Sequence, residues 1–573
     1  MSLLATYLRP EAPRAVLLGL LLFAGIGLQL ANPQIAKAFI DQAQAGEPFE
    51  QLIWIALGFI GVAILTQAAT VAEAYVAENL GWRTTNALRA DLTRHVLDLD
   101  ASFHAEHGVG ELIERIDGDV SAIADFFARF VVQVLGNGVF LLGLLVLLYR
   151  EDWRVGILLT VFALLALTFM TRGGGFVGIR SKAARQAAAD LTSYLEERLA
   201  GLPDLKSSGA DSYAMRGLHE RLAARFQSVQ RSVMAGSLFN GVVGLIFVVG
   251  TGAALGLSAA LYLQVGAITL GSVYVVFRYT GMLRQPLERL TRQMNSFQTA
   301  MGGIVRVREL LDTTSKIVDG QREIQPRGAL AVEFDRVSFA YEEEPVLRDV
   351  TFSVAPGEVL GLLGRTGSGK TTISRLLFRL HDPAAGVIRL GGAEIRTAQL
   401  DQLRQRVGLV TQDVQLFQGT LRDNVALFDP GIADARLCAV FAELGLEEWL
   451  RALPDGLDTR LGAAGRGLSA GESQLVALAR VFLKNPGLVV LDEASSRLDP
   501  LTERLLERAV ARLLEGRTGL VIAHRLSTVE RADSILILEQ GHVAELGPRA
   551  DLVDNPASRF AGLLRVGMRE ALA

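Results

Sequence analysis

Residues 358–380 read EVLGLLGRTGSGKTTISRLLFRL, and this stretch determines the fold expected for the C-terminal half of the chain. The apolar run 359–363 predicts a buried strand, and an amphipathic helix is predicted after the loop. Between them, GRTGSGKTT fits G-x-x-x-x-G-K-[ST], a loop whose glycines let backbone N–H groups surround phosphate oxygens. A chance glycine-rich turn is the alternative, but the pattern requires the flanking strand and helix that are predicted here. The candidate phosphate-binding residues are Gly364, Arg365, Thr366, Gly367, Ser368, Gly369, Lys370, Thr371 and Thr372.

A pair of acids follows a second apolar run, in GLVVLDEASSRLDP at 487–500. Residues 488–491 predict a buried parallel strand, which places Asp492 and Glu493 at the C-terminal end where α/β sites form. Asp492 is expected to hold Mg²⁺ through water, together with the Thr371 hydroxyl, and Glu493 to polarise an attacking water. Paired acids also occur simply as the first turn of a helix. The phosphate-binding loop upstream favours the catalytic interpretation.

Composition indicates more than one domain and a membrane protein. The chain has 573 residues, half of them hydrophobic, and its mean hydropathy is +0.32. The net charge of −4 has no basic excess, so no nucleic-acid partner is expected. Cys438 is the single cysteine of the sequence, so disulfides do not hold the chain together.

Long apolar runs in the first half predict transmembrane helices, each of which needs about 20 apolar residues. The strongest signal is the segment 232–277, which contains no Asp, Glu, Lys or Arg and suits two spans joined by a turn near 264–266. A buried pair of helices in a soluble protein is the alternative, but a charge-free stretch of this length disfavours it. Six spans are predicted, at 15–37, 52–75, 130–149, 155–172, 239–262 and 266–284.

Basic residues orient these spans. The segment between Lys37 and Arg83 has no Lys or Arg, whereas 83–129 and 172–231 are rich in them. Positive charge favours the cytoplasmic side, so both basic segments and both termini are expected inside. The basic segments contain good helix formers and extend the membrane helices into the cytoplasm. The first half is therefore predicted to be an α-helical domain with six transmembrane helices and long cytoplasmic extensions, in the inner (plasma) membrane.

The predicted domains are a transmembrane domain at 1–313, a linker at 314–330 and a nucleotide-binding domain at 331–573. The linker, TSKIVDGQREIQPRGAL, is polar and carries Gly and Pro. After it, alternating strand-like and helix-like runs indicate an α/β domain. With its phosphate-binding loop and acid pair, it is expected to be an α/β P-loop ATPase domain, fused to the membrane domain and lying in the cytoplasm.

These features resemble the ATP-binding cassette transporter family over the whole chain, in its exporter form. The resemblance implies ATP and Mg²⁺ as ligands. Tyr341 in VSFAY matches the aromatic residue that stacks on adenine, and Gln412 in LVTQD matches a glutamine that senses the γ-phosphate and contributes to the Mg²⁺ site. Asp499 in SSRLD matches the D-loop aspartate, and His524 in IAHRLSTV matches the histidine that contacts the γ-phosphate during catalysis.

Two polar segments of the first half also resemble the family. Residues 103–120, FHAEHGVGELIERIDGDV, look like the first intracellular loop, which touches a nucleotide-binding domain. Residues 209–222, GADSYAMRGLHERL, resemble the second loop, which in exporters reaches the partner's domain. Without the resemblance, each is read as a solvated cytoplasmic helix.

The signature motif departs from the family pattern. The family sequence LSGGQ contacts the ATP of the opposite subunit, whereas here it reads Leu468, Ser469, Ala470, Gly471 and Glu472. Ala470 adds a Cβ where the backbone approaches a ligand, and Glu472 adds negative charge near a triphosphate, which favours a weakened signature. The alternative is a capping box between Ser469 and Glu472 at the start of the next helix, in which case the substitution has no effect on function.

The altered signature bears on the partner. In heterodimeric exporters of the family, one subunit often combines an intact catalytic glutamate with an altered signature. A second half-transporter is therefore the favoured partner, and a homodimer remains open because Ser469 and Gly471 are retained.

The resemblance implies ATP-driven export of a hydrophobic or amphiphilic substrate (a drug, lipid or peptide) across the cytoplasmic membrane. The transporter is expected to work as a dimer that holds ATP between two cassettes. The alternatives are an importer on the same fold, for instance of a metal chelate, and a non-transporting regulator or channel. Glu493, Gln412 and His524 argue against a regulator, which needs no hydrolytic machinery.

Arg278 is the candidate residue of the transport path. It lies within the last predicted span, where a charge is costly and usually faces a cavity or a partner. It is expected to favour an anionic or amphiphilic substrate, with a structural pair to a neighbouring polar group as the equal alternative.

Overall fold

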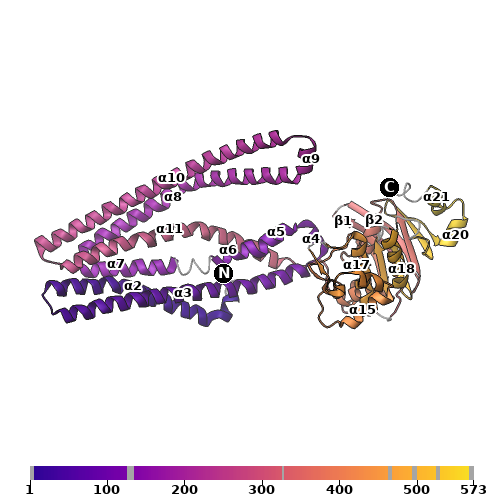
Figure 1. Ribbon diagram of the computed structural model, residues 1–573, viewed down its shortest axis with the longest axis horizontal. Helices are drawn as coiled ribbons and strands as arrows, with labels where there is room; N and C mark the ends of the chain where they lie inside the picture. The colour runs from indigo at the N-terminus through magenta and orange to yellow at the C-terminus, as the bar shows by residue number, and fades with distance from the viewer. Residues whose placement is uncertain are drawn as a thin grey trace. The chain divides into compact units, whose positions relative to one another are not determined.

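The computed structural model describes residues 6–125, 134–324, 328–342, 344–462, 467–492, 500–523 and 529–566. The chain forms two compact units (Figure 1). The first comprises Met1–Asp98 and Gly108–Thr314, and the second comprises Leu99–His107 and Ser315–Ala573. The described part of the first unit is helical, and the described strands all belong to the second.

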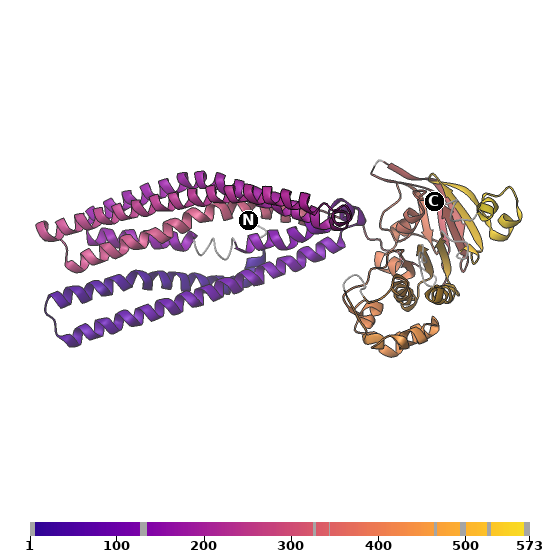
Figure 2. The same cartoon turned by 45° about the horizontal axis from the view of Figure 1, so that its top comes forward.

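Long helices make up most of the first unit. They are α2 (Ala12–Gln44), α3 (Phe49–Asp98), α7 (Gly136–Glu151), α8 (Trp153–Ala200), α10 (Asp211–Ala260) and α11 (Leu270–Asp312). Short elements join them: η1 (Arg9–Glu11), α5 (Val109–Ile113), η2 (Glu114–Asp119), α6 (Val120–Asp125), α9 (Leu202–Ser207) and η4 (Leu261–Val265). Helix α2 packs along α3 and α8 packs along α10, and both pairings are visible from two directions (Figures 1 and 2). Helix α11 packs against α2, α7, α8 and α10.

The predicted count of six spans requires correction. Among the described residues, four helices are long and apolar enough to cross a membrane: Thr6–Gln44, Phe49–Asp98, Trp153–Ala200 and Asp211–Gln264. The other two predicted spans overlap α7, whose described part has 16 residues, and α11. Arg278 and Arg284 interrupt the apolar run of α11 and lower its hydropathy, which is why this helix does not qualify.

Other features predicted for the first half are confirmed. Helices α3 and α8 have 50 and 48 residues, more than twice the length that a bilayer requires, so they extend well beyond it. The turn predicted near 264–266 is present, because Gly266 ends the preceding helical turn in the left-handed conformation, with φ of +62°.

An ion pair links three helices of the first unit. Nζ of Lys37 on α2 lies 2.6 Å from Oε2 of Glu151, the last residue of α7, whose side chain is only 8% exposed. The Ser272 hydroxyl on α11 donates to the same oxygen over 2.7 Å, and the Gln34 amide donates to the other oxygen over 3.2 Å. The carboxylate is thereby neutralised and hydrogen-bonded where a lone charge would be strongly unfavourable.

The described residues of the second unit form three sheets. The first is antiparallel, in the order β2 (Glu344–Val354), β1 (Val332–Tyr341), β4 (Ala385–Leu390) and β5 (Ala393–Glu394). The second has six strands, in the order β12 (His542–Pro548), β11 (Ser534–Glu539), β3 (Val359–Gly364), β10 (Thr518–Ile522), β9 (Leu488–Asp492) and β6 (Val407–Val410). From β11 to β6 the neighbouring strands are parallel. The third pairs β7 (Gly419–Thr420) with β8 (Arg460–Leu461).

Both faces of the parallel sheet are buried, which explains the uninterrupted apolar runs of its strands. In β9, Leu488 and Val490 join a core shared with the antiparallel sheet and α12 (Lys370–Leu377). Val489 and Leu491 point to the other face and join a core with α17 (Ala470–Lys484) and α18 (Pro500–Leu514). The remaining helices of this unit are α4 (Ala101–Glu106), η5 (Ile395–Thr397), α13 (Leu400–Arg406), α14 (Leu421–Ala426), α15 (Asp434–Glu443), α16 (Glu447–Ala452), η6 (Gly456–Asp458), α20 (Arg549–Asp554) and α21 (Arg559–Val566).

Asp100 fixes the short helix α4 within the second unit. Its Oδ1 accepts hydrogen bonds from the backbone N–H groups of Ser102 and Phe103, so Asp100 caps the helix. Its Oδ2 accepts the Lys316 N–H over 2.6 Å. Burial raises the pKa of Asp100, but the hydrogen bonds from Ser102, Lys316 and Phe103 outweigh it and lower the pKa to about 2. Part of the segment predicted as the first intracellular loop is thus tied to residues that follow the membrane helices.

Lys37→Met is expected to destabilise the first unit, because it leaves the Glu151 carboxylate without its cation in an apolar environment. The expected loss is on the order of 3 kcal/mol, measured as a lower midpoint of thermal unfolding in detergent. The matched control is Lys37→Met with Glu151→Gln, which removes both charges and should recover most of the loss. A double variant less stable than Lys37→Met would contradict the pairing.

Candidate functional site

The phosphate-binding loop joins β3 to α12, as the sequence predicts. Gly364, Gly367 and Gly369 have φ of +151°, +83° and +106°, a region that residues with a Cβ rarely adopt. A Cβ at Gly364 would lie 2.4 Å from the carbonyl oxygen of Leu538, and one at Gly369 would lie 2.6 Å from Cδ2 of Leu347. The loop therefore requires glycine at both crowded positions.

Two polar side chains of the loop are buried. Lys370 is 6% exposed, and its Nζ donates to the carbonyl oxygens of Gly364 over 2.6 Å and of Arg365 over 2.9 Å. Ser368 is 4% exposed, and its Oγ has no hydrogen-bond partner among the described residues. A buried hydroxyl without a partner costs about 1–3 kcal/mol, and a phosphate oxygen would accept its hydrogen bond. The loop thus fits an anionic ligand.

A cleft of about 1110 Å³ opens beside this loop. One wall is formed by Gly364–Ser368. The other comes from the β11–β12 hairpin and α21, and consists of Ile537, Leu538, Glu539, Gln540, His542, Ala544, Arg559, Gly562 and Leu563. Ligand pockets usually measure about 300–1,000 Å³, so this cleft can admit a molecule of nucleotide size.

The other predicted catalytic residues that are described lie at the same edge of the sheet. Asp492 ends β9 and lies opposite Ile522, the last residue of β10, which in turn lies opposite Leu362 of β3. Gln412 is exposed two residues after β6. The carboxyl ends of these parallel strands therefore carry Asp492, Gln412 and the phosphate-binding loop, the place where open α/β sheets bind ligands.

Thr371 and Thr372 lie in the first turn of α12, directly after Lys370. Thr371 is exposed and Thr372 is 5% exposed. Three further predicted residues, Glu493, Asp499 and His524, lie outside the described residues.

Tyr341, the predicted adenine-stacking residue, ends β1. Its hydroxyl accepts a hydrogen bond from Nη1 of Arg375 on α12 over 3.0 Å. The ring also packs edge-on against His381, with centroids 5.4 Å apart. Burial and the nearby Arg375 guanidinium lower the pKa of His381, which favours its neutral form. Arg375, which sequence reasoning missed, links the aromatic residue to the helix that starts at the phosphate-binding loop.

The altered signature forms the start of α17. Ser469 is its N-cap: its Oγ accepts the Glu472 N–H, and the Glu472 carboxylate accepts the Ser469 N–H. Ser469 and Ala470 are exposed, whereas Gly471 is buried. The capping box between Ser469 and Glu472, which the sequence offered as the alternative interpretation of this motif, is therefore present.

Arg480 connects the same helix to the segment after Gln412. Its guanidinium donates to the carbonyl oxygens of Gln415 over 2.8 Å and Asn424 over 2.6 Å, and to the side chain of Asn424. Asn424 in turn holds both backbone polar groups of Phe417. Burial lowers the pKa of Arg480, although it still leaves the guanidinium charged at neutral pH. Sequence analysis gave no signal for this link because its members lie far apart in the chain.

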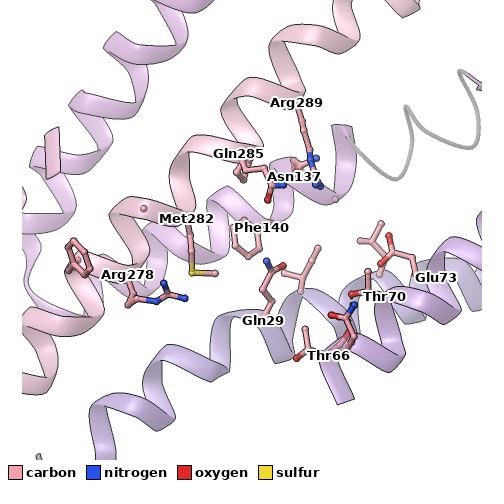
Figure 3. Close-up of a pocket in the computed structure, with 18 of the residues that line it drawn as sticks. Gln29, Thr66, Thr70, Glu73, Asn137, Phe140, Arg278, Met282, Gln285 and Arg289 are labelled. Atoms are coloured by element: carbon pink, nitrogen blue, oxygen red, sulfur yellow. Dashed lines mark hydrogen bonds between the residues drawn. The ribbon is translucent and has the colours of Figure 1, made fainter. Parts of the chain in front are cut away.

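A polar pocket of about 640 Å³ lies among the helices of the first unit. Figure 3 shows Arg278, Met282, Gln285 and Arg289 extending from α11 toward side chains of the neighbouring helices. Spacings of four, three and four residues place all four on one face of α11. The rest of the polar lining comprises Gln29 of α2, Thr66, Gln67, Thr70 and Glu73 of α3, Asn137 of α7 and Thr251 of α10. Arg278 thus faces a cavity, while Arg289 and Glu73 were not singled out from the sequence.

The loop, the parallel sheet and the apolar helices define a class, a membrane protein with its own P-loop ATPase domain. The family models agree. "ABC transporter transmembrane region" matches residues 16–287, and "ABC transporter" matches residues 347–496.

Known proteins resemble the chain over almost its whole length. It is 32% identical to an ATP-dependent lipid A-core flippase of Thiobacillus denitrificans, covering 94% of this chain and 93% of the relative. It is 30% identical to the uncharacterized ABC transporter ATP-binding protein YfiC of Bacillus subtilis, covering 96% and 91%. A solved bacterial Atm1-family ABC exporter with ATP bound is similar with a TM-score of 0.77 and 27% identity, covering 97% of this chain and 98% of that one.

The chain therefore belongs to the ATP-binding cassette transporter family, as an exporter-type half-transporter. It binds ATP, couples ATP hydrolysis to export, and lies in the inner membrane. The predicted fold class, a helical membrane domain fused to an α/β P-loop ATPase domain, is confirmed apart from the number of spans.

Gly364→Ala is expected to weaken ATP binding by at least about tenfold, because left-handed backbone alone costs an L-residue about 1–2 kcal/mol and the Cβ also meets the Leu538 carbonyl. The measurement is nucleotide affinity of the purified full-length protein. Gly367→Ala is the matched control, since Gly367 also has positive φ but a Cβ there meets nothing within 4 Å. Equal losses in the two variants would show that crowding at Gly364 is unimportant.

Proposed function

We propose that this chain exports an amphiphilic molecule with an anionic group, such as a phosphorylated lipid, and that it works as a dimer with ATP held between two cassettes. The pocket of the membrane half is the observation that carries the proposal. Arg278 and Arg289 lie eleven residues apart, three turns of α11 or about 16 Å along its axis. Glu73 is the acidic residue of the lining, so two guanidinium groups face one carboxylate and leave an excess positive charge.

This charge pattern fits a substrate with a polar anionic end. Charged residues within membrane helices are costly and usually face a cavity or water-filled path, as these two do. Guanidinium groups bind phosphate and carboxylate through paired hydrogen bonds, and the amides and hydroxyls of the lining add further polar contacts. Phe140, Phe277 and Met282 supply apolar surface in the same pocket. The flippase relatives, whose names specify lipid A-core, support an amphiphilic substrate.

The catalytic assignments belong to the same proposal. Lys370 and the loop glycines would bind the β- and γ-phosphates, and Tyr341 would stack on adenine. Thr371, Gln412 and, through water, Asp492 would hold Mg²⁺; they offer the oxygen ligands that this ion prefers, at one edge of the sheet. Bound there, Mg²⁺ would neutralise charge on the transferred phosphoryl group.

The remaining roles concern the attack on the γ-phosphate. Glu493 would orient and polarise the attacking water, and His524 would contact the γ-phosphate. Ser469 to Glu472 would act on the ATP of the opposite cassette, with Asp499 beside that contact. A single copy then supplies only half of each composite site, so the dimer is the active form.

Two copies of this chain are our proposed dimer. The sequence favours a second, different half-transporter because the LSAGE signature suggests a weak site. In the structure, the Glu472 carboxylate caps its own helix, which weakens the argument from its charge for that preference. The presence of Ser469 and Gly471, which match the LSGGQ pattern, supports the same conclusion.

Turnover by this chain alone tests the dimer. Purified into lipid without another subunit, it is expected to hydrolyse ATP, and Glu493→Gln should lower kcat by at least about 10²-fold, the usual contribution of a general base. An inactive chain that becomes active only when a second half-transporter with an LSGGQ signature is added would overturn the homodimer. In that case the heterodimer is the correct assembly.

The anionic substrate is tested with a matched pair of lipids. Stimulation of ATP turnover by a phosphorylated glycolipid should exceed stimulation by the same glycolipid without phosphate. Arg278→Gln with Arg289→Gln should raise the half-maximal concentration of the phosphorylated form about tenfold, the loss of roughly one charge-assisted hydrogen bond.

Arg284→Gln is the control for that experiment. Arg284 is also on α11, but it is absent from the pocket lining and its Nε donates to Glu288. It should leave the preference for the phosphorylated lipid unchanged. An unchanged preference in the double variant would contradict a role of Arg278 and Arg289 in substrate binding.

A further inference from the structure

We propose that Trp449 is a positioning residue for the signature motif: through Glu472 it holds the start of α17 in the arrangement that acts on the ATP of the opposite cassette. Glu472 is then a tethered cap and not a charge that opposes the nucleotide. This inference rests on the proposed role of Ser469 to Glu472 as the signature, and it adds a residue that lies outside every motif of the chain.

Both oxygens of the Glu472 carboxylate accept hydrogen bonds within the chain. Oε2 accepts the backbone N–H of Ser469 over 2.8 Å, and Oε1 accepts Nε1–H of Trp449 over 3.1 Å. The Glu472 N–H is itself bonded to Oγ of Ser469 over 3.2 Å. The side chain is therefore turned back over the first turn of α17, where the positive end of the helix dipole also stabilises a carboxylate.

Trp449 is suited to act as an anchor. It lies on α16 and packs against the core of the helical part of the domain, with its ring centroid 5.9 Å from that of Phe441 on α15. The indole offers one donor and no acceptor, so its bond to a carboxylate has a defined direction. The anchor thus joins the buried helical core to the first turn of the signature helix, while Arg480 fixes the same helix further along.

The chemistry requires a glutamate at this position and distinguishes it from glutamine. A carboxylate has two acceptor oxygens, one for each of the two N–H donors. A glutamine has one oxygen and one NH₂ group, so it can cap Ser469 but then presents a donor to the indole N–H. In this chain, the glutamate of LSAGE and the tryptophan at 449 form a matched pair that glutamine would break.

Three full-length variants in lipid test the pair: Glu472→Gln, Trp449→Phe and the double variant. Each single change should lower kcat for ATP about fivefold to tenfold. It should leave KM within about twofold, because the nucleotide binds mainly to the phosphate-binding loop of the opposite cassette, which these variants do not change. The double variant should be no slower than the slower single one, since both changes remove one interaction. A fivefold to tenfold change corresponds to about 1.0–1.4 kcal/mol, which is the usual net contribution of one hydrogen bond.

The sign of the Glu472→Gln effect separates the proposal from its rival. If the Glu472 charge repelled ATP, removing it would raise kcat, and Trp449→Phe would leave kcat unchanged. Either result overturns the proposal. The proposal is also overturned if the losses of kcat in the two single variants add up in the double variant. Trp82→Phe is the matched control. It removes the same type of bond, from a tryptophan N–H to Glu78 over 3.2 Å, on an exposed face of α3, and should leave kcat unchanged.

A second measurement does not depend on the dimer. Amide hydrogen exchange of residues 467–475 should quicken about tenfold in both single variants, because the side chain that accepts the Ser469 N–H is no longer held by the Trp449 indole. Unchanged exchange in Trp449→Phe overturns the tether even if the chain alone hydrolyses no ATP. If the chain alone hydrolyses no ATP but amide exchange is faster in the variants, the homodimer is rejected and the positioning role of Trp449 is retained.

Discussion

The register of the parallel strands determines where the chemistry of this chain can occur. Leu538 of β11 pairs with Gly364 at the end of β3, and Ile522 of β10 pairs with Asp492 at the end of β9. The backbone of β11 lies so close to Gly364 that no side chain fits there. The loop therefore leaves β3 with Gly364 in the left-handed region. These backbone pairings determine the positions of the phosphate-binding loop and of Asp492, whatever the catalytic side chains are.

Features that depend on neighbours in the sequence could be predicted. The phosphate-binding loop needs a strand, glycines and a helix in succession, and the buried strands show themselves as unbroken apolar runs. Contacts between distant segments could not be predicted. Trp449 and Glu472 are 23 residues apart, and Tyr341 and Arg375 are 34 apart. Each pair depends on how separate helices and strands pack against each other. No pattern in the sequence around Trp449 or Arg375 indicates which distant residue it contacts.

A hydropathy profile describes each helix on its own, without the neighbours against which it packs in the membrane half. It measures the transfer of one helix into lipid, so Arg278 and Arg284 disqualify α11 even though this helix packs against α2, α7 and α8. A charge that faces a polar pocket, as Arg278 does, is not transferred into lipid. The charges of Lys37 and Glu151 are not transferred into lipid either, because the two residues form an ion pair between helices. In a transporter, the residues that weaken the span signal are those that can serve transport.

The signature of this chain illustrates how one substitution can be misjudged without its contacts. Considered as a charge near a triphosphate, Glu472 suggests a weak site and a different partner. Considered with its contacts, it is an acceptor for two N–H groups, at the helix end where negative charge is favourable. The electrostatic cost to the nucleotide depends on where the carboxylate points, and here the cap turns it toward its own chain. An altered signature therefore does not by itself require a second kind of subunit. In the proposed arrangement, Trp449 and the Ser469 N–H together hold the carboxylate of Glu472 against the start of its own helix.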